Sequence, residues 1–272
     1  MAVEFDQQLV VNALKVGQQY PHLPFYLHIF DSLSSTNQTL WELLAQGEKP
    51  GTVVIATKQT AGKGQWGRQW LSPSGGLYLS VAIAPKLEAA NSYQLTLASA
   101  WGIASQLQKC NVSVGIKWPN DLVLDGRKLG GILTETKIHK GQITQAIIGV
   151  GINWTNPVPE TGINLELWQS SQNFRPIPNL EMLTSTVLLG IESGLQCLNN
   201  EGISILLSRY VDLLINMGDE VYVNNLLGTV VGVTTQGHLR LRMVEYNTKE
   251  LITPEISVEP GKISLGYCKS SV

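Results

Sequence analysis

The chain has 272 residues, of which 43% are hydrophobic and 15% are charged, and its formal net charge is -2. These values are typical of a globular protein with one large domain, or with a large and a small domain. The near-neutral charge gives no general attraction to nucleic acid. No apolar stretch reaches the roughly 20 residues of a membrane helix, and no secretory signal opens the chain, so we expect a cytoplasmic protein without membrane contact.

Three cysteines, Cys110, Cys197 and Cys268, are widely separated in the chain. They form no CxxC motif and no Cys/His cluster, so the spacing predicts neither a zinc site nor a disulfide framework. We expect reduced thiols, and no residue is assigned to a metal.

Secondary structure is predicted in chain order from hydrophobic periodicity and turn residues. Strands are expected at 25–30, 53–56, 77–83, 112–116, 121–124, 131–138 and 142–150. Helices are expected after a capping box at 35–38 and after a cap at Asn91, and further along at 180–198 and 203–215. The glycine-rich stretch 58–77 and the Pro- and Asn-rich stretch 154–179 are expected to be loops.

The sequence pattern changes after Met217, where short alternating strands are separated by tight turns. This pattern of short strands and tight turns predicts a small β-barrel. We place a domain boundary after Met217, giving domains 1–217 and 218–272. The first domain mixes hairpins and helices without regular βαβ alternation. We therefore expect an α+β fold with a mainly antiparallel sheet.

The glycine-rich loop, residues 59–68, is the first segment whose residues indicate a ligand-binding site. Gly62, Gly64 and Gly67 allow the backbone to approach a ligand closely, and Lys63 and Arg68 supply positive charge. Such a loop suits a phosphate or a carboxylate, although its spacing matches neither a Walker A loop nor a dinucleotide fingerprint. A plain surface loop remains the alternative interpretation.

Two lysines flank a predicted hairpin. Lys117 begins the motif Lys-Trp-Pro-Asn-Asp, and Lys128 follows an Asp-Gly turn at 125–126. If both side chains converge on one pocket, they suit a substrate that carries a carboxylate and a phosphate; the alternative is solvated surface charge. A third motif, Gly-Val-Gly-Ile-Asn at 149–153, ends a strand in small residues and an amide.

Together these segments resemble the biotin protein ligase family over about residues 25 to 260. The matching stretches are 35–38, 59–68, 117–122, 127–133, 149–153 and 255–257. The resemblance implies a catalytic domain related to class II aminoacyl-tRNA synthetases, followed by a small SH3-like barrel. It also implies that biotin is activated by Mg²⁺ and ATP as biotinyl-AMP, then transferred to a lysine of the biotin carboxyl carrier protein of acetyl-CoA carboxylase.

The resemblance further implies which residues bind. On the biotin side it implies Ser35, Thr36, Asn37, Gln59, Lys63, Gly64, Gln65 and Lys128. On the nucleotide side it implies Lys63, Gln65, Arg68, Lys117 and Asn153. The catalytic cations are then Lys63, Lys117 and Lys128, which neutralise the charge of two reacting anions.

Two loop positions depart from the commonest family pattern, in which arginine stands where this chain has Lys63 and Gln65. Lysine keeps the charge but loses the planar fork, and glutamine loses the charge as well. We expect this chain to retain biotinyl-AMP less tightly than members with arginine at the second position. An adenylate off-rate that is unchanged in Gln65→Arg contradicts this expectation.

Transfer requires a neutral amine on the carrier lysine, whose ordinary pKa is about 10.4. Asp121 is our candidate base; the alternatives are that it pairs with a neighbouring lysine or caps the turn. A lipoate or octanoate transferase and a biotin-responsive repressor are the rival functions. Only about 24 residues precede the first predicted strand, too few for a DNA-binding domain, so no nucleic-acid binding is expected. A homodimer remains open.

Overall fold

The structure is a computed structural model that describes residues 5–17, 23–172, 174–243, 245–246, 251–252 and 254–267. Its central sheet has eight strands: β1 (Tyr26–Phe30), β2 (Thr52–Ala56), β3 (Gly76–Ile83), β4 (Leu87–Glu88), β5 (Gly115–Lys117), β6 (Asp121–Leu124), β7 (Arg127–His139) and β8 (Gln142–Asn153). The strand order is β1-β2-β3-β8-β7-β6-β5, and β4 also pairs with β8. Only β1 and β2 are parallel, so the predicted α+β fold with a mainly antiparallel sheet is confirmed.

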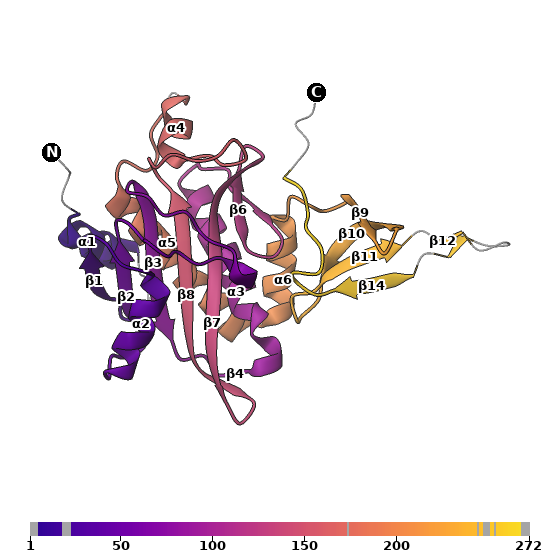
Figure 1. Cartoon of the computed structure of the whole chain (residues 1–272), viewed down its shortest axis with the longest axis horizontal. Helices are drawn as coiled ribbons and strands as arrows, with labels where there is room; N and C mark the ends of the chain where they lie inside the picture. The colour runs from indigo at the N-terminus through magenta and orange to yellow at the C-terminus, as the bar shows by residue number, and fades with distance from the viewer. Residues whose placement is uncertain are drawn as a thin grey trace.

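Helices cover both faces of this sheet (Figure 1). They are α1 (Gln7–Gly17), α2 (Thr36–Ala45), α3 (Tyr93–Lys109), α4 (Leu165–Ser170), α5 (Leu180–Gln196) and α6 (Ile203–Asp212). Side chains alternate along each strand, so Val54 packs beneath Leu40 of α2, whereas its neighbours Val53 and Ile55 belong to the larger cluster under α3 and α5. The result is a three-layer domain in which all eight residues of β3 are buried.

Close helix packing on the larger face depends on glycine. A Cβ atom on Gly102 of α3 would lie 2.0 Å from the carbonyl oxygen of Gly190 in α5, and one on Gly194 would lie 2.0 Å from the carbonyl oxygen of Ala98. Because these backbones nearly touch, alanine at either position must push the two helices apart.

The residues after α6 form a second, smaller sheet. Its strands are β9 (Glu220–Val223), β10 (Leu226–Val233), β11 (Leu239–Met243) and β14 (Glu255–Val258), in the order β14-β11-β10-β9, all antiparallel. β12 (Glu245–Tyr246) pairs separately with β13 (Leu251–Ile252). This arrangement is compatible with the predicted SH3-like barrel, and the division into domains 1–217 and 218–272 stays a prediction.

The smaller sheet lies at one end of the molecule beside α6 (Figure 1). Two side chains of the larger domain reach the turn between β10 and β11. Trp118 Nε1 donates to the carbonyl of Gly237 at 2.9 Å, and Gln94 Nε2 donates to that of Thr235 at 2.9 Å. Buried side chains of β10 and β11 also belong to the main hydrophobic cluster, so the two sheets share one core.

Three local expectations are wrong. The Ser35 side chain makes no capping hydrogen bond, although α2 begins directly after it. Asn91 does not cap α3; it lies in a short 3₁₀ turn, and the helix begins after Ser92. The stretch expected as an uninterrupted loop after β8 contains α4. Its Asn164 Oδ1 accepts from the backbone N–H of Leu167 at 2.8 Å.

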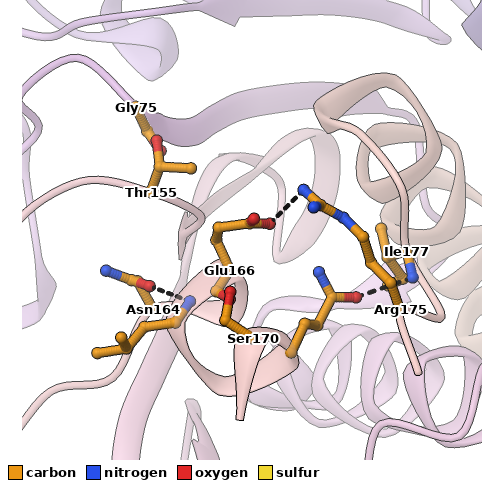
Figure 2. Close-up of polar contacts among 9 residues, drawn as sticks. Gly75, Thr155, Asn164, Glu166, Ser170, Arg175 and Ile177 are labelled. Atoms are coloured by element: carbon orange, nitrogen blue, oxygen red, sulfur yellow. Dashed lines mark hydrogen bonds and ion pairs between the residues drawn. The ribbon is translucent and has the colours of Figure 1, made fainter. Parts of the chain in front are cut away.

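An ion pair of 2.6 Å between Glu166 and Arg175 fastens α4 to the chain that follows it, as Figure 2 shows. The start of this stretch is tied to the end of the glycine-rich segment, because Thr155 Oγ1 donates to the carbonyl of Gly75 at 3.2 Å. The Thr155 contact therefore holds the start of this stretch, just after β8, against the residue that precedes β3, near the site described below.

Cys110 and Cys197 are free thiols, as expected, and Cys268 lies outside the described residues. In the part of the chain that the structure describes, no helix has the length and apolar character needed to cross a membrane.

Candidate functional site

One cavity is lined by nearly all the site residues that are predicted from the sequence. It lies where the glycine-rich loop, the start of α2, the middle of β7 and β8, and the turn between β5 and β6 meet. Residues 263–265 of the C-terminal segment complete its wall. The predicted residues that line it are Ser35, Thr36, Asn37, Gln59, Lys63, Gly64, Gln65, Arg68, Lys117, Asp121 and Lys128.

The polar end of the cavity is held by a chain of hydrogen bonds at the start of α2. Gln59 Oε1 accepts from the backbone N–H of Thr36 at 2.9 Å, and Ser80 Oγ lies 2.8 Å from Thr36 Oγ1 and 2.6 Å from Asn37 Oδ1. The sequence pattern gave Ser80 no role, since it stands inside a buried strand. These contacts fix the Asn37 amide and leave its Nδ2 buried without a partner.

Gly149 makes this placement of Asn37 possible. A Cβ atom on Gly149 would lie 2.3 Å from Asn37 Oδ1, closer than non-bonded atoms approach. The Asn37 side chain thus lies directly on the backbone of β8. Because a buried amide N–H normally finds an acceptor, its free Nδ2 marks a place for a ligand oxygen.

Trp70 supplies a second free donor and a flat wall. Its indole Nε1 is buried without a partner, and a Cβ atom on Gly151 would lie 2.5 Å from that nitrogen. The ammonium of Lys128 lies 5.2 Å from the centre of its ring. Trp70 stands just beyond the predicted loop motif and was missed by the sequence pattern.

The wall next to Trp70, here called the hairpin wall, consists of Lys117, Asp121 and Lys128. Lys128 Nζ lies 2.6 Å from Asp121 Oδ1, and Lys117 Nζ lies 3.9 Å from Asp121 Oδ2. Lys117 and Asp121 are direct cross-strand partners in β5 and β6. The predicted alternative role of Asp121, pairing with neighbouring lysines, is therefore present in the structure.

A β-bulge brings Lys128 onto the same face as Asp121. Leu122 pairs with Gly130, but Val123 pairs with Lys128, so Leu129 is skipped in the register of β6 and β7. In a regular hairpin Lys128 would point to the other face of the sheet, because side chains alternate. The bulge is what joins the two lysines at one carboxylate.

Burial lowers the pKa of Lys117 below its ordinary value of 10.5. The opposing effect of Asp121 raises this pKa, and the positive charges of Lys128 and Arg68 lower it further. Only 8% of Lys117 is exposed, so its charge is expensive to keep in place and attracts an anionic ligand strongly.

The glycine-rich loop forms the outer wall. Its backbone turns back on itself, since the N–H of Gly64 donates to the carbonyl of Arg68 at 2.7 Å and that of Trp70 donates to Gly62 at 3.0 Å. The side chains of Lys63 and Arg68 are exposed to solvent. Gln65, in a short 3₁₀ turn (Gln65–Gly67), buries its Oε1 without a partner.

Asn153 is the one predicted site residue that does not line the cavity. Its Nδ2 donates to the backbone carbonyl of Lys128 at 3.3 Å, and its Oδ1 accepts from Asn156 Nδ2 at 2.9 Å. Both ends of the amide are thus used by the protein, where they support the backbone of Lys128. Its nucleotide-binding role stays a prediction.

Tyr267 is a further residue that the sequence pattern missed. Its hydroxyl donates to Asp121 Oδ2 at 2.7 Å, and the ammonium of Lys117 lies 3.9 Å from the centre of its ring. The C-terminal segment thus reaches the hairpin wall, 146 residues away in sequence from Asp121.

Comparison with known proteins agrees with this geometry. The model of the biotin/lipoate A/B protein ligase family matches residues 29–153, which contain most of the cavity. The bifunctional ligase/repressor BirA of Escherichia coli is 33% identical over 215 residues, which are 77% of this chain and 67% of that protein. BirA of Bacillus subtilis is 38% identical over 148 residues, or 54% of this chain and 46% of that protein.

The chain therefore spans about half the length of the Bacillus subtilis relative and two thirds of the Escherichia coli one. Among solved structures, the biotin protein ligase from Aquifex aeolicus in complex with biotin and ATP has the same fold, with a TM-score of 0.67 and 24% sequence identity. The superposition covers 84% of this chain and 94% of the Aquifex chain. This chain belongs to the biotin/lipoate A/B protein ligase family and, within it, to the biotin protein ligases.

Proposed function

We propose that this protein activates biotin with ATP to biotinyl-AMP and transfers the biotinyl group to a lysine of a biotin carboxyl carrier protein. The observation that carries the proposal is the polarity of the cavity. Two buried, unpartnered donors, Asn37 Nδ2 and Trp70 Nε1, line the cavity together with the ammonium groups of Lys117 and Lys128, so the cavity offers both neutral donors and positive charge. Biotin has a neutral ureido carbonyl at one end and a carboxylate at the other, which matches this arrangement.

In the first half-reaction, the biotin carboxylate attacks the α-phosphorus of ATP, and pyrophosphate leaves with the electron pair of the broken P–O bond. Two anions must approach each other, so the enzyme contributes mainly positioning and positive charge. Lys117 and Lys128 are pre-positioned for this by Asp121. Lys63 of the glycine-rich loop adds a third cation from the opposite wall.

In the second half-reaction, the carrier lysine gives up a proton and its neutral amine attacks the acyl carbonyl. AMP leaves with the electron pair of the C–O bond, and the second amine proton passes to solvent. Among the residues described, Asp121 is the one carboxylate that lines the cavity, which makes it the proposed base. When the Lys128 ammonium turns toward the anionic adenylate, Asp121 Oδ1 becomes free to accept that proton.

Mg²⁺ is proposed to enter with ATP. No group of three or more His, Cys, Asp or Glu side chains that could hold a metal occurs among the described residues. Mg²⁺ is commonly bound through substrate phosphates and water rather than by a dedicated cage of protein ligands, so we assign it no protein ligand here. The ion supplies additional neutralisation of the phosphate charge.

The decisive experiment is incubation of the protein with biotin, Mg-ATP and a biotin carboxyl carrier domain, followed by mass measurement of the carrier. The proposal predicts a gain of one biotinyl group, lost when the carrier's target lysine is replaced. Lipoate is the matched control, because its dithiolane ring has no carbonyl for Asn37 and Trp70. Modification by lipoate and not by biotin would overturn the assignment.

Three accompanying expectations stay predictions: location in the cytoplasm, no binding of nucleic acid, and a homodimer as one possible assembly. A DNA mobility assay with biotin and ATP present tests the second. Light scattering with and without biotin and ATP tests the third.

A further inference from the structure

The C-terminal segment touches the most buried charges of the site. Residues 263–265 line the cavity, and Tyr267, two residues further, contacts two members of the hairpin wall with one side chain. The ring lies against the Lys117 ammonium, and the hydroxyl donates to Asp121. No motif of the sequence and no part of the mechanism above uses this residue.

The two oxygens of Asp121 have different partners. Oδ1 faces Lys128 at 2.6 Å, whereas Oδ2 accepts from Tyr267 at 2.7 Å and lies 3.9 Å from Lys117. Burial and the nearby Asp121 carboxylate raise the pKa of the Tyr267 hydroxyl, so it remains protonated and remains a donor. The tyrosine hydroxyl carries no charge, so anionic substrates do not draw it away from Asp121 as they draw the Lys128 ammonium.

Lys117 gains its orientation from the same side chain. A lysine has four rotatable bonds, and an ammonium over the face of an aromatic ring is attracted to the ring's negative centre. The 3.9 Å contact fixes the ammonium of a side chain that is almost completely buried.

We propose that Tyr267 is a positioning residue of the active site: it holds Asp121 through Oδ2, so that Oδ1 is the proton-accepting oxygen, and it orients the Lys117 ammonium toward the nucleotide. The inference rests on the proposed function for the two half-reactions. It assigns the hydroxyl to the transfer step and the ring to the adenylation step.

Two substitutions separate the hydroxyl from the ring. Tyr267→Phe keeps the ring and removes the donor, whereas Tyr267→Leu removes both. The matched controls are Tyr222→Phe and Tyr222→Leu, because Tyr222 belongs to the same C-terminal region but is 73% exposed. Each half-reaction is measured alone, as pyrophosphate release with biotin and ATP and as carrier labelling with supplied biotinyl-AMP.

In Tyr267→Phe we expect kcat for transfer to fall roughly tenfold, the usual consequence of losing a hydrogen bond to a charged group. The KM for the carrier and the rate of pyrophosphate release stay within about twofold of wild type, because the ring still contacts Lys117 and Asp121 Oδ1 still pairs with Lys128. In Tyr267→Leu we expect, in addition, a rise of about fivefold in the KM for ATP, because the Lys117 ammonium loses its ring contact. Both Tyr222 variants behave as wild type.

A measurement that does not depend on catalysis is the rate at which an amine-acylating reagent labels Lys117, followed by peptide mass mapping. Labelling of Lys117 is expected to rise several-fold in Tyr267→Leu and to stay unchanged in Tyr267→Phe. A wild type that releases no pyrophosphate overturns the proposed function, whereas an active wild type with an unaffected Tyr267→Phe overturns only this inference. Equal losses in both half-reactions, together with a lowered melting temperature, show a structural role and also overturn it.

Discussion

The two charged walls of the cavity use the same kind of side chain in opposite environments. The hairpin wall buries Lys117 and half-buries Lys128 around one carboxylate, with a tyrosine completing the cluster. The glycine-rich loop presents Lys63 and Arg68 to solvent, and Arg68 lies 5.6 Å from the ring of the exposed Trp66. One wall holds its cations among buried side chains, and the other leaves its cations in solvent.

This difference indicates separate contributions to binding and catalysis. Buried charges pay a desolvation cost in advance, so they act on an anion at close range and are little affected by salt. Solvated charges attract anions weakly and are screened by salt. We therefore assign the chemical step to the hairpin wall and the capture and enclosure of the ligand to the glycine-rich loop.

The largest effect is expected from Lys128→Ala. The substitution removes the cation closest to Asp121, so Asp121 Oδ1 loses its ion pair and faces two anionic substrates. Pyrophosphate release should fall by about 10²- to 10³-fold, as for other lost transition-state contacts, while circular dichroism shows a folded protein. Lys86→Ala, a surface control, should be silent. Near-normal release from Lys128→Ala contradicts the role of the hairpin wall.

Gly149→Ala tests the part of the cavity around Asn37, outside the two charged walls. Its Cβ would lie 2.3 Å from Asn37 Oδ1, so the Asn37 amide must move. We expect the KM for biotin to rise roughly tenfold with little change for ATP, and stability to fall by about 1–3 kcal/mol.

Combining Gly149→Ala with Asn37→Ala relieves the clash, so the double variant should recover part of the lost stability. The free energies of unfolding come from a thermal or urea denaturation series. If the losses in the two single variants simply add in the double variant, the two residues are not in steric conflict.

The pH dependence of ATP binding separates Lys117 from a solvated lysine. Because burial lowers its pKa in the folded protein, Lys117 loses its charge at lower pH than 10.5, and the KM for ATP should then rise several-fold. Lys117→Arg should keep a flat KM over the same alkaline range, since arginine stays protonated. Identical alkaline profiles for both proteins would refute a role for this charge.

The same lowered pKa has a consequence for stability with a definite sign. Between the folded pKa and the unfolded value of 10.5, the unfolded chain binds more protons than the folded one. The free energy of unfolding contributed by Lys117 should therefore rise with pH across that window. Urea titrations should show this rise in wild type and its absence in Lys117→Met.

The smallest effect is expected from Lys63→Ala. Exposed charges contribute about 0.2–1 kcal/mol, so the KM for ATP or biotin should change only about two- to fivefold, and less at high salt. Lys128→Ala should remain inactive at any salt concentration. A large, salt-independent loss in Lys63→Ala would erase the difference between the walls.

Much of the fold was predictable because its patterns are local. The Asp125-Gly126 turn has both residues at positive φ, with values of 47° and 68°, as an Asp-Gly hairpin requires. The helices α3, α5 and α6 follow apolar stripes in the sequence. Capping was less predictable: Ser35 has the right residue type and backbone angles, but its side chain makes no capping bond.

The site was predictable as a set of motifs but not as a geometry. Alternation along a regular strand puts Lys128 on the wrong face, and only the bulge at Leu129 corrects this. Trp70 and Ser80 belong to no motif, because an indole beside a loop and a serine in an apolar strand are ordinary in sequence. Tyr267 could not be placed, since its contact with Asp121 depends on how the smaller sheet packs on the larger domain.

The most direct test is a crystal structure of the protein with biotinyl-AMP bound. The account predicts the ureido ring against Asn37 and Trp70, and the phosphate within about 3 Å of the ammonium groups of Lys117 and Lys128, with Lys63 closing from the loop. A bound adenylate that leaves Lys63, Lys117 and Lys128 facing bulk solvent would contradict it.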